Sequence, residues 1–542
     1  MYSCPSCGGN VRFDIESQQM KCPYCSNLYT IEEMDSRMEE DAKETELFDV
    51  TVFTCPQCGG ELYSSDTDAT SFCPYCGGAD ILSSRLAKEK KPDKIIPFKI
   101  TKDVCKKNYL AKMKESFYVP KEMKEEARIE SFRGIYMPYW TYRISQKGSF
   151  VCTGETKTTD IEDIIVRTYL CSGMLDTMYY GYSCDASTSF YDNISECLAP
   201  FDTKAFVDFT PAYLSGFYAD IADVDSVIYE GFAKDYANRV TAAELKKDPL
   251  MREYHANVDA NATNAKLHTT LTGTERTMFP VWFMSYRMMD ERVAYAAVNG
   301  QTGKVVSDMP VDPKKYCLIS LGVGFVLFLL LNLFLSLRSD RLIVLALVLA
   351  IISGLMYIRE LKQILKRSRN EDDLGLLAKE EGYEAALKKS NENNHLRKST
   401  SKKKNTLAGA IPIIIILVFV LFSLFSDAGI SLGVLIRALA GSSLVSLAAA
   451  VAAVIVGMWG MAEYKRTEEG KGCLGYVLML AASVCCILVT ILSPASDMFY
   501  YAAGILTLVS VIVQMLDLIR NHNILMTRRL PQFDKKGGDD RA

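Results

Sequence analysis

The hydrophobic pattern divides the chain into a first part of mixed character and a second part with long apolar runs. Each run has close to the roughly 20 residues that cross about 30 Å of hydrocarbon. The pattern predicts six transmembrane helices, at Tyr316–Leu337, Leu342–Ile358, Leu407–Phe425, Ala438–Met461, Cys473–Leu492 and Phe499–Ile519. Short polar loops join them in pairs, so we expect three helical hairpins, over residues 316–358, 407–461 and 473–519.

Basic residues lie mainly on one side of these helices. Segments 359–406, 460–472 and 520–542 carry 13, 3 and 6 Lys+Arg, whereas the opposite loops carry only three arginines. Because basic loops stay in the cytoplasm, we expect a multi-pass membrane protein with both termini cytoplasmic. In segment 359–406, Lys398 and Lys402, Lys403 and Lys404 precede the third span. They indicate either contact with anionic lipid or a topology signal alone.

Residues 92–315 mix helical and strand periodicities, which predicts a cytoplasmic α+β domain. We expect one helix over Thr101–Phe117 and a second from Pro120 to about Phe132. Apolar spacing in the first helix turns four residues inward, Val104, Leu110, Met113 and Phe117. Helical character returns over residues 226–246, and extended segments are predicted at 135–144, 149–152 and 164–171. Residues 293–306 read as a hairpin around an Asn-Gly turn.

Two segments of this domain share a Pro-x-Trp pattern. Met137-Pro-Tyr-Trp140 is echoed by Phe279-Pro-Val-Trp282, and Tyr-Arg follows both. Either the domain has two related halves, or both segments are edge strands, where Pro is tolerated. The aromatic residues form either a binding strip or, as favoured by the usual place of large aromatics, part of the core.

Charge follows the same division of the chain. Through Lys315 there are 36 Lys+Arg against 47 Asp+Glu, and from Tyr316 onward there are 25 against 18. The chain therefore joins an acidic soluble half to a basic membrane half. This composition argues against a purely soluble enzyme, a secreted disulfide protein and a basic nucleic-acid binder.

The strongest chemical signal is a repeat of cysteine pairs. Cys-Pro-x-Cys pairs occur twice in each of two units, 14 residues apart within a unit, and the units are offset by 51 residues. The eight cysteines are Cys4, Cys7, Cys22, Cys25, Cys55, Cys58, Cys73 and Cys76. Each pair predicts a tight turn, and two turns bring four thiolates into the closed tetrahedron of a structural zinc site. We expect two zinc ions as cofactors. Four-thiolate iron and redox dithiols are the alternatives.

The remaining elements of this region are short. Val11–Phe13 and Glu61–Tyr63 are the expected strands after the first turn of each unit. Thr30-Ile-Glu-Glu33 is a capping box that predicts a helix running to about Leu47. No His-Glu-x-x-His, Gly-x-Ser-x-Gly or dinucleotide motif occurs in the sequence, so we find no catalytic constellation and expect no enzyme.

These motifs together resemble a known family. The cysteine repeats are followed by Ile96-Pro-Phe98-Lys, Gly134-Ile-Tyr-Met-Pro138-Tyr-Trp140, Pro280-Val-Trp282 and Asn299-Gly-Gln-Thr-Gly-Lys304-Val before a membrane span. Over about residues 1–340 the chain resembles the zinc-ribbon membrane proteins of Gram-positive bacteria, often labelled transcription-factor-IIB-type or primosome-like. The resemblance implies zinc in the ribbons and an inner-membrane location, and it implies no activity, since ribbons recur on unrelated machines.

The expected architecture is multidomain: two four-Cys zinc ribbons, an α+β soluble domain and an all-α six-helix membrane region. Its units are ribbon 1 (1–29), a helical linker (30–51), ribbon 2 (52–91), the α+β domain (92–315), hairpin 1 (316–358), the basic segment (359–406), hairpin 2 (407–461), hairpin 3 (473–519) and the tail (520–542).

The expected function is a cytoplasmic module that binds or assembles an unidentified protein. Alternatives are a transporter or channel with a regulatory zinc-ribbon domain, a membrane-tethered nucleic-acid-associated factor, and an unrecognised enzyme in the middle domain. Residues 1–91 carry 8 basic and 16 acidic residues, a balance that repels phosphate and disfavours nucleic acid as the partner.

Overall fold

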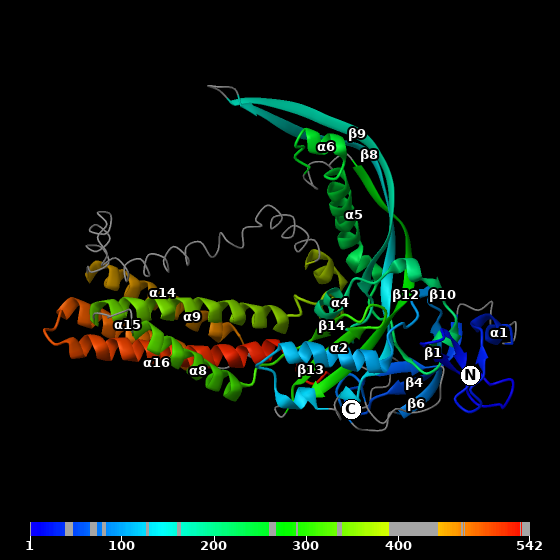
Figure 1. Ribbon diagram of the computed structural model, residues 1–542, viewed down its shortest axis with the longest axis horizontal. Coiled ribbons are helices and arrows are strands. Elements are labelled where there is room, and N and C mark those ends of the chain that lie inside the picture. Colours follow the sequence, from blue (N-terminus) through cyan, green and yellow to red (C-terminus); the bar gives the residue numbers. More distant parts are fainter. Residues whose placement is uncertain are drawn as a thin grey trace.

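The computed structural model has a Cys-rich N-terminal region, a sheet-rich domain and a helical C-terminal part (Figure 1). It describes residues 2–37, 47–64, 73–78, 83–125, 129–159, 164–258, 267–288, 291–332, 339–389, 443–467, 470, 472–531 and 533. The sheet domain lies between the N-terminal region and the helical part, so the chain is extended along one axis.

Ribbon 1 forms a small antiparallel sheet of its own from β1 (Arg12–Asp14), β2 (Gln19–Lys21) and β3 (Leu28–Tyr29). The capping box is confirmed, because Thr30 accepts a hydrogen bond from the Glu33 amide and the Glu33 carboxylate accepts one from the Thr30 amide. The expected helix length is wrong. α1 (Ile31–Asp35) is a little over one turn, and Leu47 begins a strand instead. The acidic residues between them, at 38–46, lie outside the described part.

An 11-stranded sheet holds the rest of the soluble part. Its strands are β4 (Leu47–Thr54), β5 (Glu61–Ser64), β6 (Ser83–Lys90), β7 (Lys94–Ile95), β8 (Arg133–Thr159), β9 (Ile164–Asp185), β10 (Val207–Asp208), β11 (Tyr218–Asp220), β12 (Leu267–Arg287), β13 (Val293–Asn299) and β14 (Val305–Ser307). The main order is β10-β7-β12-β8-β11-β5-β4-β6, and β5 pairs with β11. Ribbon 2 therefore belongs to the same sheet as the middle domain.

Two strands of this sheet leave it as a long arm (Figure 1). β8 and β9 pair over almost their full lengths, with Thr159 opposite Ile164 at the far end and Tyr139 opposite Asp185 at the base. The segments expected at 135–144, 149–152 and 164–171 are therefore pieces of two long strands. β12 continues along the other edge of β8 from Phe283 to Leu267.

The two Pro-x-Trp segments pair with each other in the middle of the sheet. Pro280 lies opposite Tyr136, and Met278 lies opposite Pro138. The edge-strand interpretation is wrong, since β8 and β12 both have neighbours on either side here. Trp140 and Trp282 donate their indole N–H groups to the Val224 and Ile100 carbonyls, each at 2.7 Å. These aromatic residues pack into the domain as core residues.

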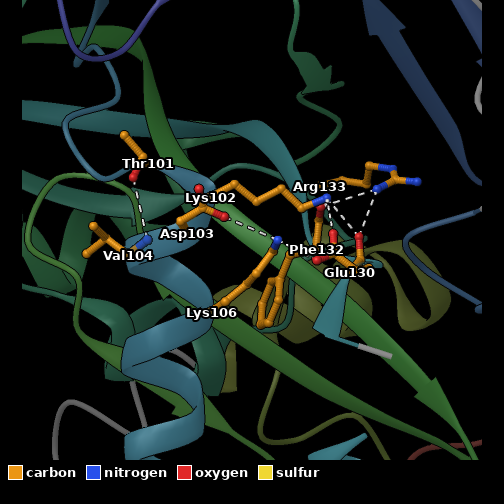
Figure 2. Close-up of polar contacts among 8 residues, drawn as sticks. All are labelled: Thr101, Lys102, Asp103, Val104, Lys106, Glu130, Phe132 and Arg133. Atoms are coloured by element: carbon orange, nitrogen blue, oxygen red, sulfur yellow. Dashed lines mark hydrogen bonds and ion pairs between the residues drawn. The ribbon is translucent and has the colours of Figure 1, made fainter. Parts of the chain in front are cut away.

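Helix α2 (Lys102–Glu115) confirms the first helix of the domain and part of its expected inward face, since Met113 is buried and Leu110 packs against the core. Its buried residues include Cys105, Tyr109 and Met113, whereas Val104 and Phe117 are exposed. Where a second helix was expected to begin, the chain forms the short 3-10 turn η2 (Lys121–Lys124), and residues 126–128 of that range lie outside the described part. Figure 2 shows how the chain after it is held to the start of α2. Lys106 lies 2.5 Å from the Glu130 carboxylate, and Lys102 donates to the Glu130 carbonyl at 2.8 Å.

The other soluble helices surround the sheet. They are α4 (Asp192–Leu198), α5 (Glu230–Leu245) and α6 (Pro249–Glu253), with 3-10 turns η3 (Thr203–Ala205), η4 (Pro211–Leu214) and η5 (Ser226–Tyr229). α5 and η5 confirm the helix expected over residues 226–246. β13 and β14 confirm the hairpin, with Gly303 at φ +77° in its turn.

The helical part consists of α8 (Pro313–Asn332), α9 (Ser339–Ser368), α10 (Leu374–Glu381), α14 (Ser443–Arg466), α15 (Leu474–Leu492) and α16 (Asp497–Leu525). All but α10 are long and apolar enough to cross a membrane. α9, α14, α15 and α16 pack as a bundle around residues such as Tyr357, Tyr476 and Met479, whereas α8 is exposed along its apolar length. The third expected span, Leu407–Phe425, and the lysines Lys398 and Lys402–Lys404 lie outside the described residues.

Candidate metal centres

Each of the four Cys-Pro-x-Cys turns has the same backbone form. The amide of the first cysteine donates to the carbonyl five residues on, as from Cys55 to Gly60 at 2.9 Å. The carbonyl of the first cysteine accepts from the residue four places on, as from Gly59 at 2.9 Å. That residue takes a positive φ in every turn, between 61° and 74°. These bonds curl the chain so that both thiols of a pair point to one side.

The eight cysteines form two clusters, as the spacing predicted. In ribbon 1 the Sγ atoms of Cys4 and Cys25 are 3.5 Å apart, and those of Cys7 and Cys22 are 3.4 Å apart. This cluster reaches the surface, because Cys7 is exposed. Tyr29 lies 3.4 Å from the Cys4 sulfur, and this hydrogen bond lowers the pKa of Cys4 to about 6.

The cluster of ribbon 2 is fully buried. Cys55 and Cys76 have Sγ atoms 3.8 Å apart, and Cys58 and Cys73 have theirs 3.7 Å apart. The Gly78 amide donates to the Cys76 sulfur at 3.4 Å, a contact that favours a thiolate. Apolar residues from the sheet and the chain end cover the site, among them Tyr75, Phe283 and Phe533.

Both clusters have the dimensions of a tetrahedral thiolate site. An ion held about 2.3 Å from four sulfurs at the corners of a tetrahedron separates the sulfurs by about 3.8 Å. In each cluster the four sulfurs lie within 4.8 Å of one another, and all eight cysteines are free of disulfides. Each cluster can therefore hold one metal ion with all four positions filled by protein.

A contact that the sequence did not indicate joins ribbon 2 to the end of the chain. The Phe533 amide donates to the Cys58 carbonyl at 2.7 Å, and its ring packs against Tyr75 at 5.5 Å between centroids. Upstream, Arg528 and Val293 exchange backbone hydrogen bonds of 2.7 and 2.8 Å. Residues 526–531 and Phe533, here called the tail strap, therefore tie α16 to the sheet and to the second metal site. The residues that it joins are more than 230 positions apart in the sequence, so no local sequence pattern predicts these contacts.

Buried carboxylates lie at another junction between the soluble part and the helices. The Asp192 carboxylate accepts from the Leu374 amide at 2.9 Å, and the Asp373 carboxylate accepts from the Asp192 amide at 3.3 Å. Burial raises the pKa of Asp373 to about 6 and raises the pKa of Asp192 and of Asp185 well above the usual range. No local pattern in the sequence marks these carboxylates as buried.

Comparison with known proteins relates the chain to a bacterial protein. The chain matches no model of a known protein family, and no solved structure matches it. It is 26% identical over 355 residues to "Uncharacterized protein YdjG" of Bacillus subtilis (strain 168). The match covers 61% of this chain and 96% of that protein. In the described part of the chain, the two four-Cys clusters and the five helices long and apolar enough to cross a membrane fit a membrane protein with a metal-binding domain.

Proposed function

We propose that this chain is a multi-pass inner-membrane protein whose cytoplasmic part, built on two structural zinc ribbons, binds or assembles another protein. Zinc is the proposed ion, because closed four-thiolate tetrahedra are typical of structural zinc. The basic segments beside the helices favour a cytoplasmic location for both termini. A reducing cytoplasm also suits eight free metal-binding thiols.

The observation that carries the protein-binding role is the arm. Along β9, alternate residues turn to the face opposite α5 and α6, and five of those residues are large and apolar. They are Ile164, Val166, Leu170, Met174 and Met178, here called the arm stripe. Leu170, Met174 and Met178 are 73%, 81% and 66% exposed. An apolar stripe of this length on a soluble surface is characteristic of an interaction site.

The backbone of the same strand strengthens the argument. Among the described residues β9 pairs only with β8, so along the arm, over residues 164–180, no strand covers its other edge. The opposite face of β9 packs against the helices, since the Tyr179 hydroxyl of β9 and the Thr241 hydroxyl of α5 lie 2.6 Å apart. A rigid strand with a free edge and an apolar face suits the addition of an extended segment from a partner. The acidic balance of residues 1–91 favours a protein over nucleic acid.

Photo-crosslinking in intact cells tests this role. A photoreactive residue at Ser172, which lies in the arm stripe's face, is expected to give a discrete adduct with a second polypeptide. A probe at Thr177, on the opposite face of the same strand, serves as the matched control. The variant Leu170→Ser/Met174→Ser/Met178→Ser is expected to reduce the Ser172 adduct severalfold while metal content stays unchanged. An adduct that survives the triple substitution, or no adduct from Ser172, contradicts the protein-binding role.

A further inference from the structure

A groove lies between α9 and α14 at the end of the bundle that faces the soluble domain. Its volume is about 370 Å³, and its lining includes Leu355, Ile358, Arg359, Lys362, Lys366 and Trp459. This end of the bundle is identified by a contact next to the groove. Arg367 of α9 donates to the Leu525 carbonyl, just before the tail strap. The groove therefore lies where the two spans leave the apolar layer.

The lining changes character along the helix axis. Leu355 and Ile358 belong to the apolar span, and the next turns of α9 bring Arg359, Lys362 and Lys366 to the same side, at spacings of three and four residues. Trp459 of α14 stands across from them, with the Lys362 ammonium 4.5 Å from its ring centroid. Tryptophan is enriched at the membrane–water interface, where one side of the ring is apolar and the other is wet.

Among the described residues, the basic groups of the groove outnumber the acidic groups that face it. Glu463 is the acidic group of that part of the chain in the groove: its carboxylate lies 3.9 Å from Lys362 and 3.8 Å from Arg466, and it accepts from the Trp459 indole at 3.2 Å. Arg359, Lys362 and Lys366 are all exposed, so one carboxylate meets three cations of the groove as well as Arg466. An apolar floor that ends in excess positive charge is complementary to a lipid with an anionic headgroup.

We infer that this groove binds one anionic phospholipid of the leaflet next to the soluble domain. The acyl chain lies along Leu355 and Ile358, and the phosphate meets Arg359, Lys362 and Lys366. The inference rests on the membrane location in the proposed function. It places the lipid contact between helices of the bundle, whereas the sequence suggested Lys398 and Lys402–Lys404, in the basic segment.

Binding is tested on the full-length protein by titration with phosphatidylglycerol and phosphatidylcholine, followed by native mass spectrometry. Saturable retention of phosphatidylglycerol in preference to phosphatidylcholine is expected. Because each basic residue contributes about fivefold to affinity for an anionic lipid, Arg359→Gln/Lys362→Gln/Lys366→Gln is expected to weaken retention roughly 100-fold. The variant Lys107→Gln/Lys114→Gln/Lys246→Gln removes the same charge from the soluble surface and is expected to retain the lipid like the wild type.

Three results overturn the inference. One is unchanged retention in the groove variant, and another is loss of retention in a Lys398→Gln/Lys402→Gln/Lys403→Gln variant alone. The third is equally tight binding of soluble glycerol 3-phosphate, which would make the groove a site for a free anion. Labelling a cysteine placed at Asp497 from outside intact cells reports the orientation separately. A failure of the proposed topology is therefore distinguishable from a failure of the groove.

Discussion

At the residue scale, one backbone position has the same uncommon conformation in all four metal-binding turns. The residue after the second cysteine has a positive φ in all of them: Gly8, Gly59 and Gly77 at 72–74°, and Ser26 at 61°. Glycine takes this conformation without steric cost, whereas a side chain costs about 1–2 kcal/mol. A Cβ at Gly8 would meet nothing within 4 Å, but a Cβ at Gly59 would lie 2.3 Å from the Phe533 carbonyl oxygen. The glycine of ribbon 2 therefore serves the tail strap as well as the turn.

This difference predicts unequal effects of one substitution at equivalent positions. Gly8→Ala should cost about 1–2 kcal/mol of local stability through backbone strain alone. Gly59→Ala adds a steric clash, so it should also release the tail strap and lower the melting temperature further. Hydrogen exchange of residues 526–531 measures the release and should rise only in Gly59→Ala. Equal exchange in the two variants would show that the strap does not depend on close approach to the turn.

At the element scale, features encoded by local spacing were predictable and those made by long-range pairing were not. The cysteine repeat, the Thr30 capping box and the β13–β14 hairpin each depend on residues within one short segment, and the structure contains all three. The register of β8 against β12 joins segments about 140 residues apart, so the two Pro-x-Trp segments looked like separate edge strands. The inward face of α2 was predicted only in part, because the helix also packs against a later segment: the Tyr109 hydroxyl donates to the Met123 carbonyl of η2.

The junction of α4 and α10 predicts a pH dependence. Asp373 accepts from the Leu376 amide at the start of α10, and burial raises its pKa to about 6, with Asp192, Asp372 and Arg528 as its charged neighbours. A carboxyl whose pKa is higher in the folded state stabilises the fold at low pH, and this contribution is lost as pH rises through the folded-state value. Between pH 5 and 7.5 the loss is on the order of 1 kcal/mol.

Asp373→Asn keeps a side-chain oxygen for the α10 cap but removes the titrating proton. The difference in melting temperature, variant minus wild type, should therefore become more positive from pH 5 to 7.5. Thermal unfolding of the full-length protein in detergent measures it, and using the difference cancels the pH effect on the metal sites, which both proteins share. If the melting-temperature difference stays constant with pH, the Asp373 carboxyl is not the group that titrates, and another carboxyl of the junction carries the pH dependence.

At the scale of the whole molecule, the two metal sites have unlike positions. Ribbon 1 has its own three-stranded sheet at the end of the molecule away from the helices (Figure 1). Ribbon 2 contributes β4, β5 and β6 to the central sheet, and its Cys58 carbonyl holds the strap that continues from α16. The second site therefore stands at a junction between the soluble part and the membrane bundle, and its metal is expected to stabilise more than its own ribbon.

Removing one ligand from each site tests this unequal role. Cys22→Ser and Cys73→Ser should each reduce bound zinc from two ions per chain to one, since a four-thiolate site loses most of its roughly 10–16 kcal/mol of binding energy when it is broken. Both should leave membrane insertion intact, because the spans insert through their own hydrophobicity. Metal analysis of the purified membrane fraction measures both, and unchanged zinc in either variant would refute that site.

Beyond the metal, Cys22→Ser should raise hydrogen exchange only around β1–β3. Cys73→Ser should raise it in β4, β5 and the tail strap and lower the melting temperature more, because the strap loses its anchor at Cys58. If the two variants loosen the strap equally, the second metal does not hold the two halves of the molecule together.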